Sequence, residues 1–380
     1  MRFAKFYLIL ALLSAFTLGM FGQAHNAAIA TYTINCSYNP ETRIIDGEMQ
    51  IWWSKPLEPK AEELQFHLYL NAFSGPNSTF MKEYGEFPTS VAQKSGYCKI
   101  QKIEIYNIDV TESMKFIQPN DGNEHDSTVI AIPIPEPQDI TFNENPNTPT
   151  LLLSAERQKS TPQLSIKIKF QSKLPALLER VGVYEGFIMA AQWFPQLGVL
   201  EEEGWKCHQF HANSEFYANF GTYDVSLTLP ANYVVGATGE MLERKMLPGS
   251  LQKLRFKARR VHDFAWCADA TMSEVWVAAS GPHVFCGNSI IQKEQSQSER
   301  LQSNAKSQIQ SEPRIRLLYQ PEHEGLISER ILTAVKAGLN YYESRYGKYP
   351  YFTNNCNRRP GFQRRYGVSY SFPNREFRRL

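Results

Sequence analysis

Two histidines three positions apart, His208 and His211, are the residues whose types and spacing point most directly to chemistry, and Cys207 precedes them. Imidazole nitrogens and thiolates are ligands that zinc prefers, and two histidines at i and i+3 of a helix can hold one ion. The neighbouring residues, however, have the pattern of a loop and a strand, in which positions i and i+3 point to opposite faces. We therefore predict that both histidines are structural, and metal binding is the alternative.

Three further polar groups suggest chemistry less strongly. The acidic run at 201–203 is typical of a solvated loop rather than of a catalytic carboxylate cluster. Asp263, beside large apolar residues, is typical of a strand end with a capping or turn-forming acid. His323 and Glu324 begin the zinc motif H-E-x-x-H, but Ile327 stands where the second histidine is needed. The sequence has no nucleophile elbow, P-loop or dinucleotide fingerprint, so it shows no complete active site.

Strands must position any such site, because short segments that alternate apolar and polar residues dominate the chain. Turn-forming Gly, Pro and Asn separate these segments, and no helical run lies between them. This pattern predicts a mainly β fold, a sandwich or a large open sheet. The candidate strands are residues 44–53, 64–70, 129–134, 164–170, 225–229, 254–258 and 275–278.

The end of the chain has a different pattern. After a β domain at 25–285 comes a polar linker or insertion at 286–312, and then a short strand at 315–319. Apolar residues from Ile327 to Tyr346 recur three or four positions apart, which predicts a helix that ends at Gly347. We interpret residues 313–351 as the start of a second domain that the chain does not complete.

Residues 352–380 form a tail without a helical or strand period. The tail contains seven Arg, no Lys and one acid, which gives it a net charge of +6, whereas the formal charge of the whole chain is only +2. The first 351 residues therefore carry a net negative charge, and we expect no nucleic-acid partner. A solvated end is the simplest reading of the tail.

Residues 1–24 have the features of a secretory signal. Arg2 and Lys5 precede an apolar run at 6–21, and Gly22-Gln23-Ala24 resembles a cleavage site. We predict an exported protein, periplasmic or secreted, and the alternative is an uncleaved membrane anchor formed by residues 6–21. The six cysteines permit disulfides after export, but their pairing cannot be derived from spacing.

Five stretches have the order and spacing of motifs in one family of enzymes. They are ELQFHLYLNAF (63–73), QWFP (192–195) with GW (204–205), FYANFGTYDV (216–225) through GATG (236–239), HDFAW (262–266), and LNYY to YGKYPY (339–351). Together they resemble the gluzincin zinc aminopeptidases, the family of membrane alanyl aminopeptidase. The resemblance implies an N-terminal β-saddle or β-sandwich domain. It also implies the first strand and helix of a thermolysin-like α/β catalytic domain, which this chain does not complete.

In that family, a G-x-M-E strand binds the amino end of the peptide, and H-E-x-x-H with a distant Glu binds zinc. Neither motif occurs in this chain. The resemblance therefore implies an N-terminal fragment of an exported metallopeptidase, inactive by itself, with zinc and the peptide substrate belonging to the intact relative. A polar side chain of the β domain helps to hold the substrate amine in the family, and Gln192 is the candidate here. A structural, hydrogen-bonded glutamine is the alternative reading of Gln192.

Two further hypotheses concern the chain as a whole. With free choice of synonymous codons, residues 352–372 read one nucleotide later can spell SQITVIDAPASNAGMEYPTL, which continues YPY into the family's G-x-M-E motif. We therefore expect that the chain is truncated or frameshifted after Tyr351. The alternative function is that of a non-catalytic, extracytoplasmic β-sandwich that binds a partner as an adaptor.

Overall fold

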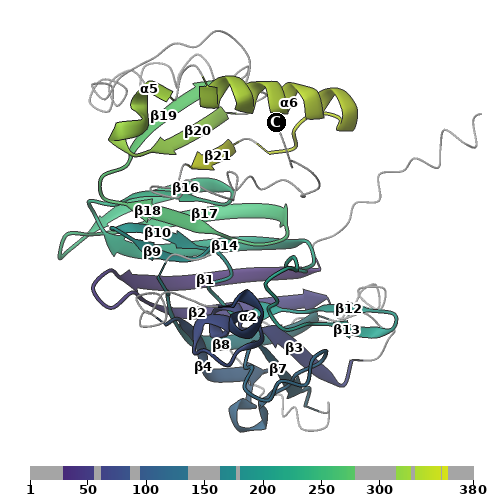
Figure 1. Cartoon of the computed structure of the whole chain (residues 1–380). Helices are drawn as coiled ribbons and strands as arrows, with labels where there is room; N and C mark the ends of the chain where they lie inside the picture. Colours follow the sequence, from purple (N-terminus) through teal and green to yellow (C-terminus); the bar gives the residue numbers. More distant parts are fainter. Residues whose placement is uncertain are drawn as a thin grey trace, which may run out of the picture.

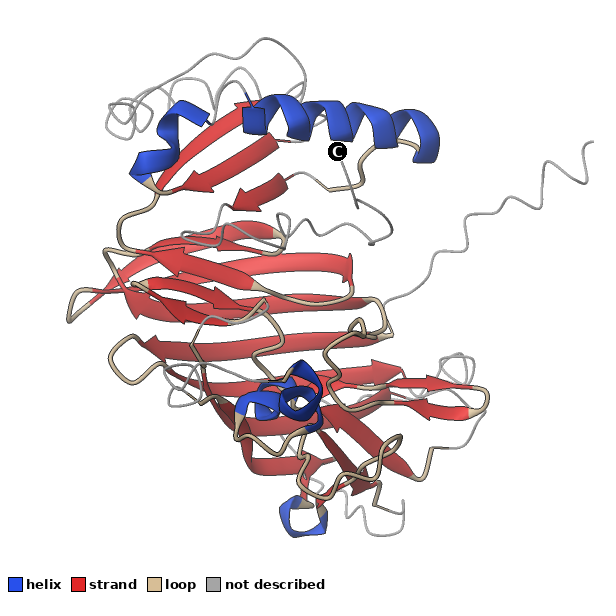
Figure 2. Ribbon diagram, in the orientation of Figure 1, coloured by secondary structure: helices blue, strands red, loops and turns tan. Residues whose placement is uncertain are grey.

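The computed structural model describes residues 29–54, 61–85, 95–135, 163–176, 180–278, 314–326, 330–351 and 353–357. Strands dominate these residues and helices are few (Figure 2), which confirms the prediction of a mainly β fold. No helix within these ranges is long and apolar enough to cross a membrane. The predicted signal at 1–24 and the polar stretch at 286–312 lie outside the described residues.

An eight-stranded sheet is the largest element of the molecule (Figure 1), with the strand order β16-β17-β14-β1-β2-β8-β4-β5. Neighbouring strands are antiparallel except β1 and β14, which run parallel with Ala30 opposite Gly221. The strands are β1 (Ala30–Asn39), β2 (Ile44–Ser54), β4 (Tyr97–Ile105), β5 (Ile108–Asp109), β8 (Gln163–Lys173), β14 (Gly221–Pro230), β16 (Glu240–Leu247) and β17 (Leu251–Val261).

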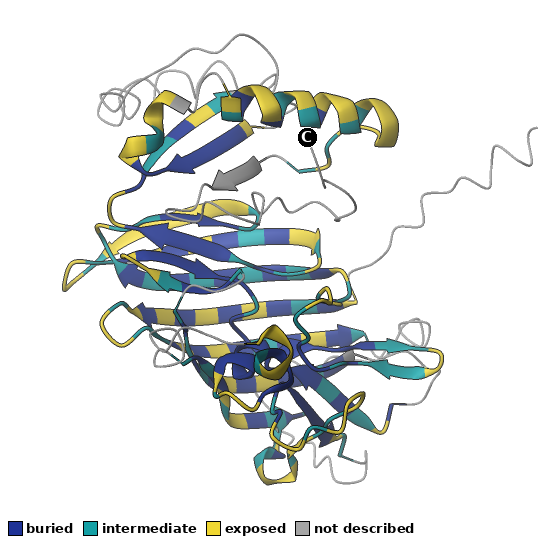
Figure 3. Ribbon diagram, in the orientation of Figure 1, coloured by how far each residue is buried: buried dark blue, intermediate teal, exposed yellow. Residues whose placement is uncertain are grey.

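Apolar and polar residues alternate along these strands, so the sheet has one buried and one open face (Figure 3). Every second residue of β14 is buried, and β1 follows the same period. Successive side chains of a strand point to opposite faces, which is why the alternation fixes the face that is buried. On β2, Gly47 leaves room for the Phe170 ring, because an added Cβ would lie 2.4 Å from that ring.

Two four-stranded sheets share one continuous apolar core with the large sheet. One sheet consists of β15 (Val234–Ala237), β18 (Trp266–Asp269), β10 (Phe187–Ala190) and β9 (Gly182–Tyr184). The other consists of β11 (Gln196–Leu197), β3 (Glu63–His67), β7 (Val129–Pro133) and β6 (Lys115–Phe116). We call these three sheets, with the elements that connect them, the large β unit.

Short elements complete the large β unit. They are the hairpin of β12 (Val199–Glu201) and β13 (Gly204–Lys206), the helix α2 (Thr79–Tyr84), and the 3₁₀ turns η1 (Tyr69–Phe73) and η2 (Thr111–Ser113). Ser78 begins α2, because its hydroxyl accepts the backbone N–H of Met81.

A second body, the small unit, contains the three-stranded sheet β19-β20-β21 and the helix α6. Its elements are β19 (Ser273–Ala278), β20 (Arg314–Tyr319), η5 (Pro321–His323), α5 (Glu324–Leu326), α6 (Leu332–Tyr346) and β21 (Thr353–Asn357). As predicted, α6 ends at Gly347, which has a positive φ of 91°. The sequence places the candidate strand at 275–278 in the domain at 25–285, but in the structure β19 pairs along its whole length with β20. The small sheet therefore includes a strand from before the predicted boundary, and the chain returns to it after residue 313.

The tail also differs from the prediction at its start. Thr353–Asn357, expected to lack regular structure, forms β21 parallel to β20. A parallel ladder needs only backbone N–H and C=O groups, so residues without apolar alternation can join the free edge of β20. Residues 358–380 lie outside the described residues.

The two units are joined by specific contacts. An added Cβ on Gly236 of β15 would lie 2.2 Å from Leu318 Cδ1 of β20, so the glycine leaves space for that leucine. Arg316 of β20 donates from Nη1 to the Val235 carbonyl oxygen at 2.8 Å and also pairs with Glu274 of β19. These contacts fix the small sheet against the edge of β15.

Candidate functional site

Two of the stretches on which the resemblance rests lie side by side in the large β unit. Residues 191–195 connect β10 to β11, which begins at Gln196, and residues 262–265 connect β17 to β18. Three side-chain hydrogen bonds join them. They run from Gln192 Nε2 to Asp263 Oδ2 (3.0 Å), from Trp193 Nε1 to the Phe264 carbonyl oxygen (2.9 Å) and from Gln196 Nε2 to the His262 carbonyl oxygen (3.1 Å).

Two more of the matched stretches reach the same place. Phe220 packs on the His262 ring, with 3.9 Å between ring centroids, and His262 Nδ1 lies 2.9 Å from the Ala218 carbonyl oxygen. Tyr351, at the end of the YPY sequence, donates from its hydroxyl to the Arg260 carbonyl oxygen at 2.7 Å. Four stretches that are far apart in the sequence therefore converge around residues 260–263.

Asp263 is the charged group of this site. The residue keeps some exposed surface, but its carboxyl group lies among protein atoms. Desolvation by this burial raises the pKa of Asp263 to about 6, although hydrogen bonds from Phe264 and Gln192 oppose the shift. Burial also raises the pKa of the neighbouring Tyr32 and Tyr223 hydroxyls, so both remain neutral near pH 7.

Gln192 has an unusual backbone and a defined amide orientation. Its φ of +50° lies in the left-handed region, which a residue with a side chain seldom adopts. An ionised carboxylate only accepts hydrogen bonds, so the amide NH₂ group must face Asp263. Within the described part of the chain, no hydrogen bond to the other amide atom, Oε1, is found. Gln192 therefore presents one carbonyl acceptor beside a buried negative charge, an arrangement suited to a positively charged donor.

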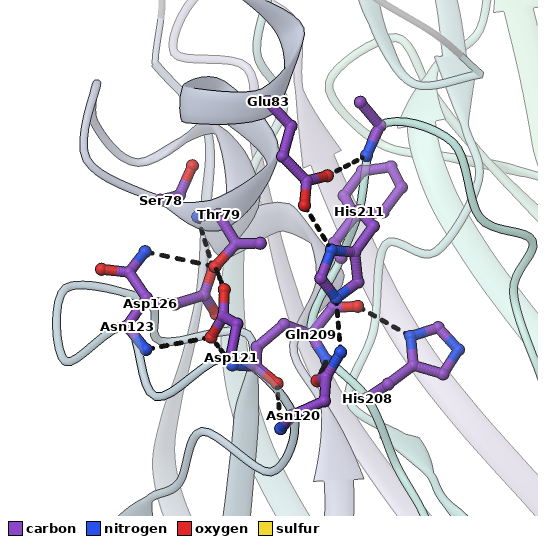
Figure 4. Close-up of polar contacts among 12 residues, drawn as sticks. Ser78, Thr79, Glu83, Asn120, Asp121, Asn123, Asp126, His208, Gln209 and His211 are labelled. Carbon is purple, nitrogen blue, oxygen red and sulfur yellow. Dashed lines mark hydrogen bonds and ion pairs between the residues drawn. The ribbon is translucent and has the colours of Figure 1, made fainter.

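The predicted histidine pair lies elsewhere, in the segment after β13 (Figure 4). His211 Nδ1 is 2.7 Å from Glu83 Oε1 of α2, and Nε2 is 2.6 Å from Asn120 Nδ2. Asn120 Oδ1 accepts the Gln209 N–H, so the Asn120 amide NH₂ faces His211. Nε2 of His211 therefore accepts, and Nδ1 donates to Glu83, which leaves His211 no nitrogen for a metal.

The strand pattern predicted that His208 and His211 point to opposite faces, but in the structure the two rings lie close together. Their ring centroids are 6.3 Å apart, because residues 207–211 form an irregular segment instead of a strand. His208 Nδ1 lies 2.7 Å from the Gln209 carbonyl oxygen.

The carboxylates of Asp121 and Asp126 also accept hydrogen bonds from nearby protein groups. Asp126 accepts the backbone N–H groups of Thr79 and Thr128, at 3.0 and 2.8 Å. Asp121 accepts the Asn123 N–H at 2.9 Å and the Gln209 amide (Figure 4). These bonds join the start of α2 to two loops, so the cluster has a structural explanation.

A buried Cys–His contact was not predicted. Cys207 Sγ lies 3.4 Å from His67 Nε2, although 140 residues separate the two in the sequence. Burial lowers the pKa of His67 to about 3 and raises the pKa of the Cys207 thiol, so both groups are neutral near pH 7. No local spacing signals this contact, because the two residues come from different sheets and loops.

The remaining predicted groups are placed as follows. Glu201 accepts the Tyr217 hydroxyl at 2.5 Å, and Glu203 pairs with Lys206 at 3.1 Å, both at the β12–β13 hairpin. The cysteines whose side chains are described are buried and form no disulfide with one another, namely Cys36, Cys98, Cys207 and Cys267.

The residues that the structure describes do not fit a catalytic zinc. Among the described residues, no group of three or more His, Cys, Asp or Glu side chains could hold a metal ion. The full sequence contains no H-E-x-x-H motif, and a catalytic zinc usually needs three protein ligands.

No protein-family model and no curated protein sequence matches this chain. Solved structures with a similar course of the chain include the M1 zinc metallopeptidase from Deinococcus radiodurans (12% identity, TM-score 0.43). They also include aminopeptidase A from Legionella pneumophila in complex with aspartic acid (11% identity, TM-score 0.46). In each comparison 88% of this chain is covered, but it spans only 57% and 29% of the other chains, respectively. The likeness is loose, and no activity follows from it.

Proposed function

We propose that this chain is the N-terminal part of a gluzincin aminopeptidase-like protein that acts on peptides from their amino end. The observation that carries the proposal is the convergence of four matched stretches around residues 260–263. These stretches meet because β10 pairs with β18 and β14 pairs with β17, so the quoted motifs belong to one packed region of the β domain. In the intact relative, zinc would supply the activated water, and this part would contribute to holding the substrate.

The contribution of this part is recognition of the peptide's amino end. An α-ammonium group is a cationic donor with three N–H bonds, and Gln192 Oε1 is a carbonyl acceptor beside the Asp263 carboxylate. The resemblance assigns amine binding to a polar side chain of the β domain, and Gln192 meets that requirement by its chemistry.

The chain by itself is proposed to have no peptidase activity, because its residues do not fit a catalytic zinc. The test is to purify the whole chain and measure bound zinc together with hydrolysis of L-alanine p-nitroanilide. We expect neither stoichiometric zinc nor chelator-sensitive hydrolysis. A chain that held one zinc and lost its activity on chelation would contradict the proposal.

We further propose that the reading frame changes near residue 352, so that the intact relative continues with the G-x-M-E and H-E-x-x-H motifs. Sequencing the source DNA from codon 340 onward tests this directly. Both motifs in one shifted frame would support the proposal. A shifted frame without G-M-E-Y-P would exclude it.

Export to the periplasm, the cell surface or the medium is proposed from residues 1–24. Mass spectrometry of the mature amino terminus distinguishes cleavage after Ala24 from retention of residues 6–21 as an anchor. An intact Met1 on a protein recovered from the cytoplasm would contradict export.

A second candidate function, a non-catalytic binding protein, is favoured by one observation. The open face of the large sheet carries a groove of about 720 Å³, which is lined mainly by polar and charged residues. Its lining includes Thr33, Asn35, Asp224, Lys245, Lys253 and Arg255. If the groove is a binding site, Lys253→Glu should abolish capture of a partner and Asp263→Asn should not. The opposite pattern would favour the aminopeptidase-like reading.

A further inference from the structure

We propose that Asp263 is a positioning residue that orients Gln192 so that its carbonyl oxygen receives the ammonium group of a peptide. The inference deepens the proposed function and rests on it, because it assumes that Gln192 contacts the substrate amine. It assigns a role to a residue whose sequence context indicates only a strand end.

The first argument is the hydrogen-bond direction. Gln192 Nε2 lies 3.0 Å from Asp263 Oδ2. A glutamine amide can rotate by half a turn at little cost in water, which would exchange its donor and acceptor. A carboxylate accepts and does not donate, so the Asp263 contact excludes the rotated state and leaves Oε1 as the presented atom.

The second argument is the rigidity of both partners. Asp263 Oδ1 accepts the Phe264 N–H at 2.7 Å, which fixes the carboxylate relative to its own backbone. Trp193, next to Gln192, is buried and donates to the Phe264 carbonyl oxygen at 2.9 Å. Gln196 Nε2 donates to the His262 carbonyl oxygen at 3.1 Å, so the two connecting segments are held together on both sides of Asp263.

The third argument is the backbone strain at Gln192. A non-glycine residue at a φ of +50° is held in an unfavourable conformation by its surroundings. Such residues concentrate at functional sites, where the strained backbone directs a side chain to a position that a relaxed backbone would not allow. Here the strained residue is also the one that carries the presented acceptor.

The fourth argument is charge. No positively charged side chain forms an ion pair with Asp263 among the described residues. The ionisable groups that lie close enough to interact electrostatically with the Asp263 carboxyl are the hydroxyls of Tyr32, Tyr69 and Tyr223 and the imidazole of His262. A buried carboxylate without a counter-ion attracts a cation placed at the neighbouring Gln192 oxygen.

The experiment uses the whole chain with ¹⁵N-labelled glutamine, and it follows the Gln192 side-chain amide by NMR. The probe is L-phenylalaninamide, which has a free α-amine, and its control is N-acetyl-L-phenylalaninamide. Asp263→Asn tests the positioning role because it keeps the shape and removes the charge. Asp269→Asn, a change of another acid in the same stretch of chain, is the matched control variant.

In the wild-type chain, we expect the Gln192 amide signals to titrate between pH 4 and pH 8, and to shift with the free amine but not with the acetylated control. A His262→Gln variant should retain that titration, since it arises from Asp263. In Asp263→Asn the titration should vanish and the affinity for the free amine should fall by about tenfold, the loss typical of one hydrogen bond to a charged group. Asp269→Asn should behave like the wild-type chain.

Two other results would overturn the inference, and they are distinguishable. If Asp263→Asn bound the free amine as tightly as the wild-type chain, the positioning role would be wrong while amine recognition stood. If the wild-type chain did not respond to the free amine at all, amine recognition by Gln192 would fail, and this inference with it. Unfolding curves of each variant show that the comparison is made between folded chains.

Discussion

The large β unit and the small unit bury their apolar residues on very different scales. The core of the large unit includes Trp53, Trp193 and Trp266, each at most 2% exposed. Among the described residues, the core of the small unit contains Val275, Ile315, Leu317, Tyr319, Leu332, Val335 and Leu339 and no tryptophan. On α6, Tyr341 and Tyr346 remain 53% and 80% exposed. Because the hydrophobic contribution scales with buried apolar area, the large unit should be stable by itself and the small unit should depend on its contacts with β15.

The largest expected change in stability comes from replacing one of two adjacent tryptophans of β2. Trp53 is 2% exposed and packs near Trp205, whereas Trp52 is 45% exposed on the other face. Trp53→Ala should lower the free energy of unfolding of the large unit by about 3–5 kcal/mol, the range for truncating a buried aromatic. Trp52→Ala is the matched control and should cost about 1 kcal/mol or less. Equal losses in urea unfolding would show that the two faces of the sheet are not distinct.

The next largest effect is the pH dependence of stability that the buried carboxyl group of Asp263 should cause in the large unit. Burial raises the pKa of Asp263 to about 6, and an aspartate in an unfolded chain has a pKa of about 4. Between these values the folded chain keeps a proton that the unfolded chain has released. The raised pKa therefore favours folding at low pH, and this contribution is lost as the pH rises through 6.

Asp263→Asn removes this titration. Relative to the wild-type chain, the variant should gain up to about 3 kcal/mol of stability between pH 4 and pH 7, as two pKa units imply. The measurement is the difference between the two urea-unfolding free energies at each pH, with Asp269→Asn as the control. A difference that does not depend on pH would contradict the burial of an ionisable carboxyl group at this position.

A smaller loss of stability, confined to the small unit, is expected from a substitution at its contact with β15. Gly236→Ala places a methyl group against Leu318, which is fully buried, and overpacking of this kind costs about 1–3 kcal/mol. We expect amide hydrogen exchange to become faster in β20 and α6 while β1 keeps its protection. Gly75→Ala is the control, since an added Cβ there meets no atom within 4 Å. Faster exchange throughout the chain would mean that the two units unfold as one.

The smallest effect concerns the exposed side of α6. Tyr346→Ser removes a ring that is 80% exposed, so the midpoint of thermal unfolding should hardly change, with a free-energy change of about 0.5 kcal/mol or less. Leu339 is buried on the same helix, so Leu339→Ala should lower the free energy of unfolding of the small unit by about 2–5 kcal/mol. If Tyr346→Ser destabilised the chain as much as Leu339→Ala, the ring would have a partner in solution.

The sequence predicted individual strands well where one face of the strand is buried and the other is exposed. Residues 44–53, 164–170 and 254–258 all lie within observed strands, because a half-buried strand imposes its period on the residues. The end of α6 was also predicted, since Gly347 adopts the positive φ that stops a helix. The edge strand β16 was missed, because all but one of its residues are exposed and it carries no alternation.

The residues of the candidate site could be singled out from the sequence only in part. Gln192 was singled out through the resemblance, and Asp263 was noticed but interpreted as a capping acid. Their contact joins connections that are 71 positions apart in the chain, and no period or spacing within either connection encodes it. The same is true of His67 and Cys207, and of the strand β19, whose partner β20 follows a long interval of chain.

What the sequence determined by itself, then, is the local conformation of the chain and the side of each strand that is buried. Both depend on the fixed period of a strand or helix and on the polarity of neighbouring residues. Only the tertiary structure decided that β1 pairs with β14, that β21 joins β20, and that Asp263 lies against Gln192. Backbone hydrogen bonds are nearly the same for every residue, so they do not label the partner strand. The desolvation that gives Asp263 its raised pKa exists only after distant segments have packed around it.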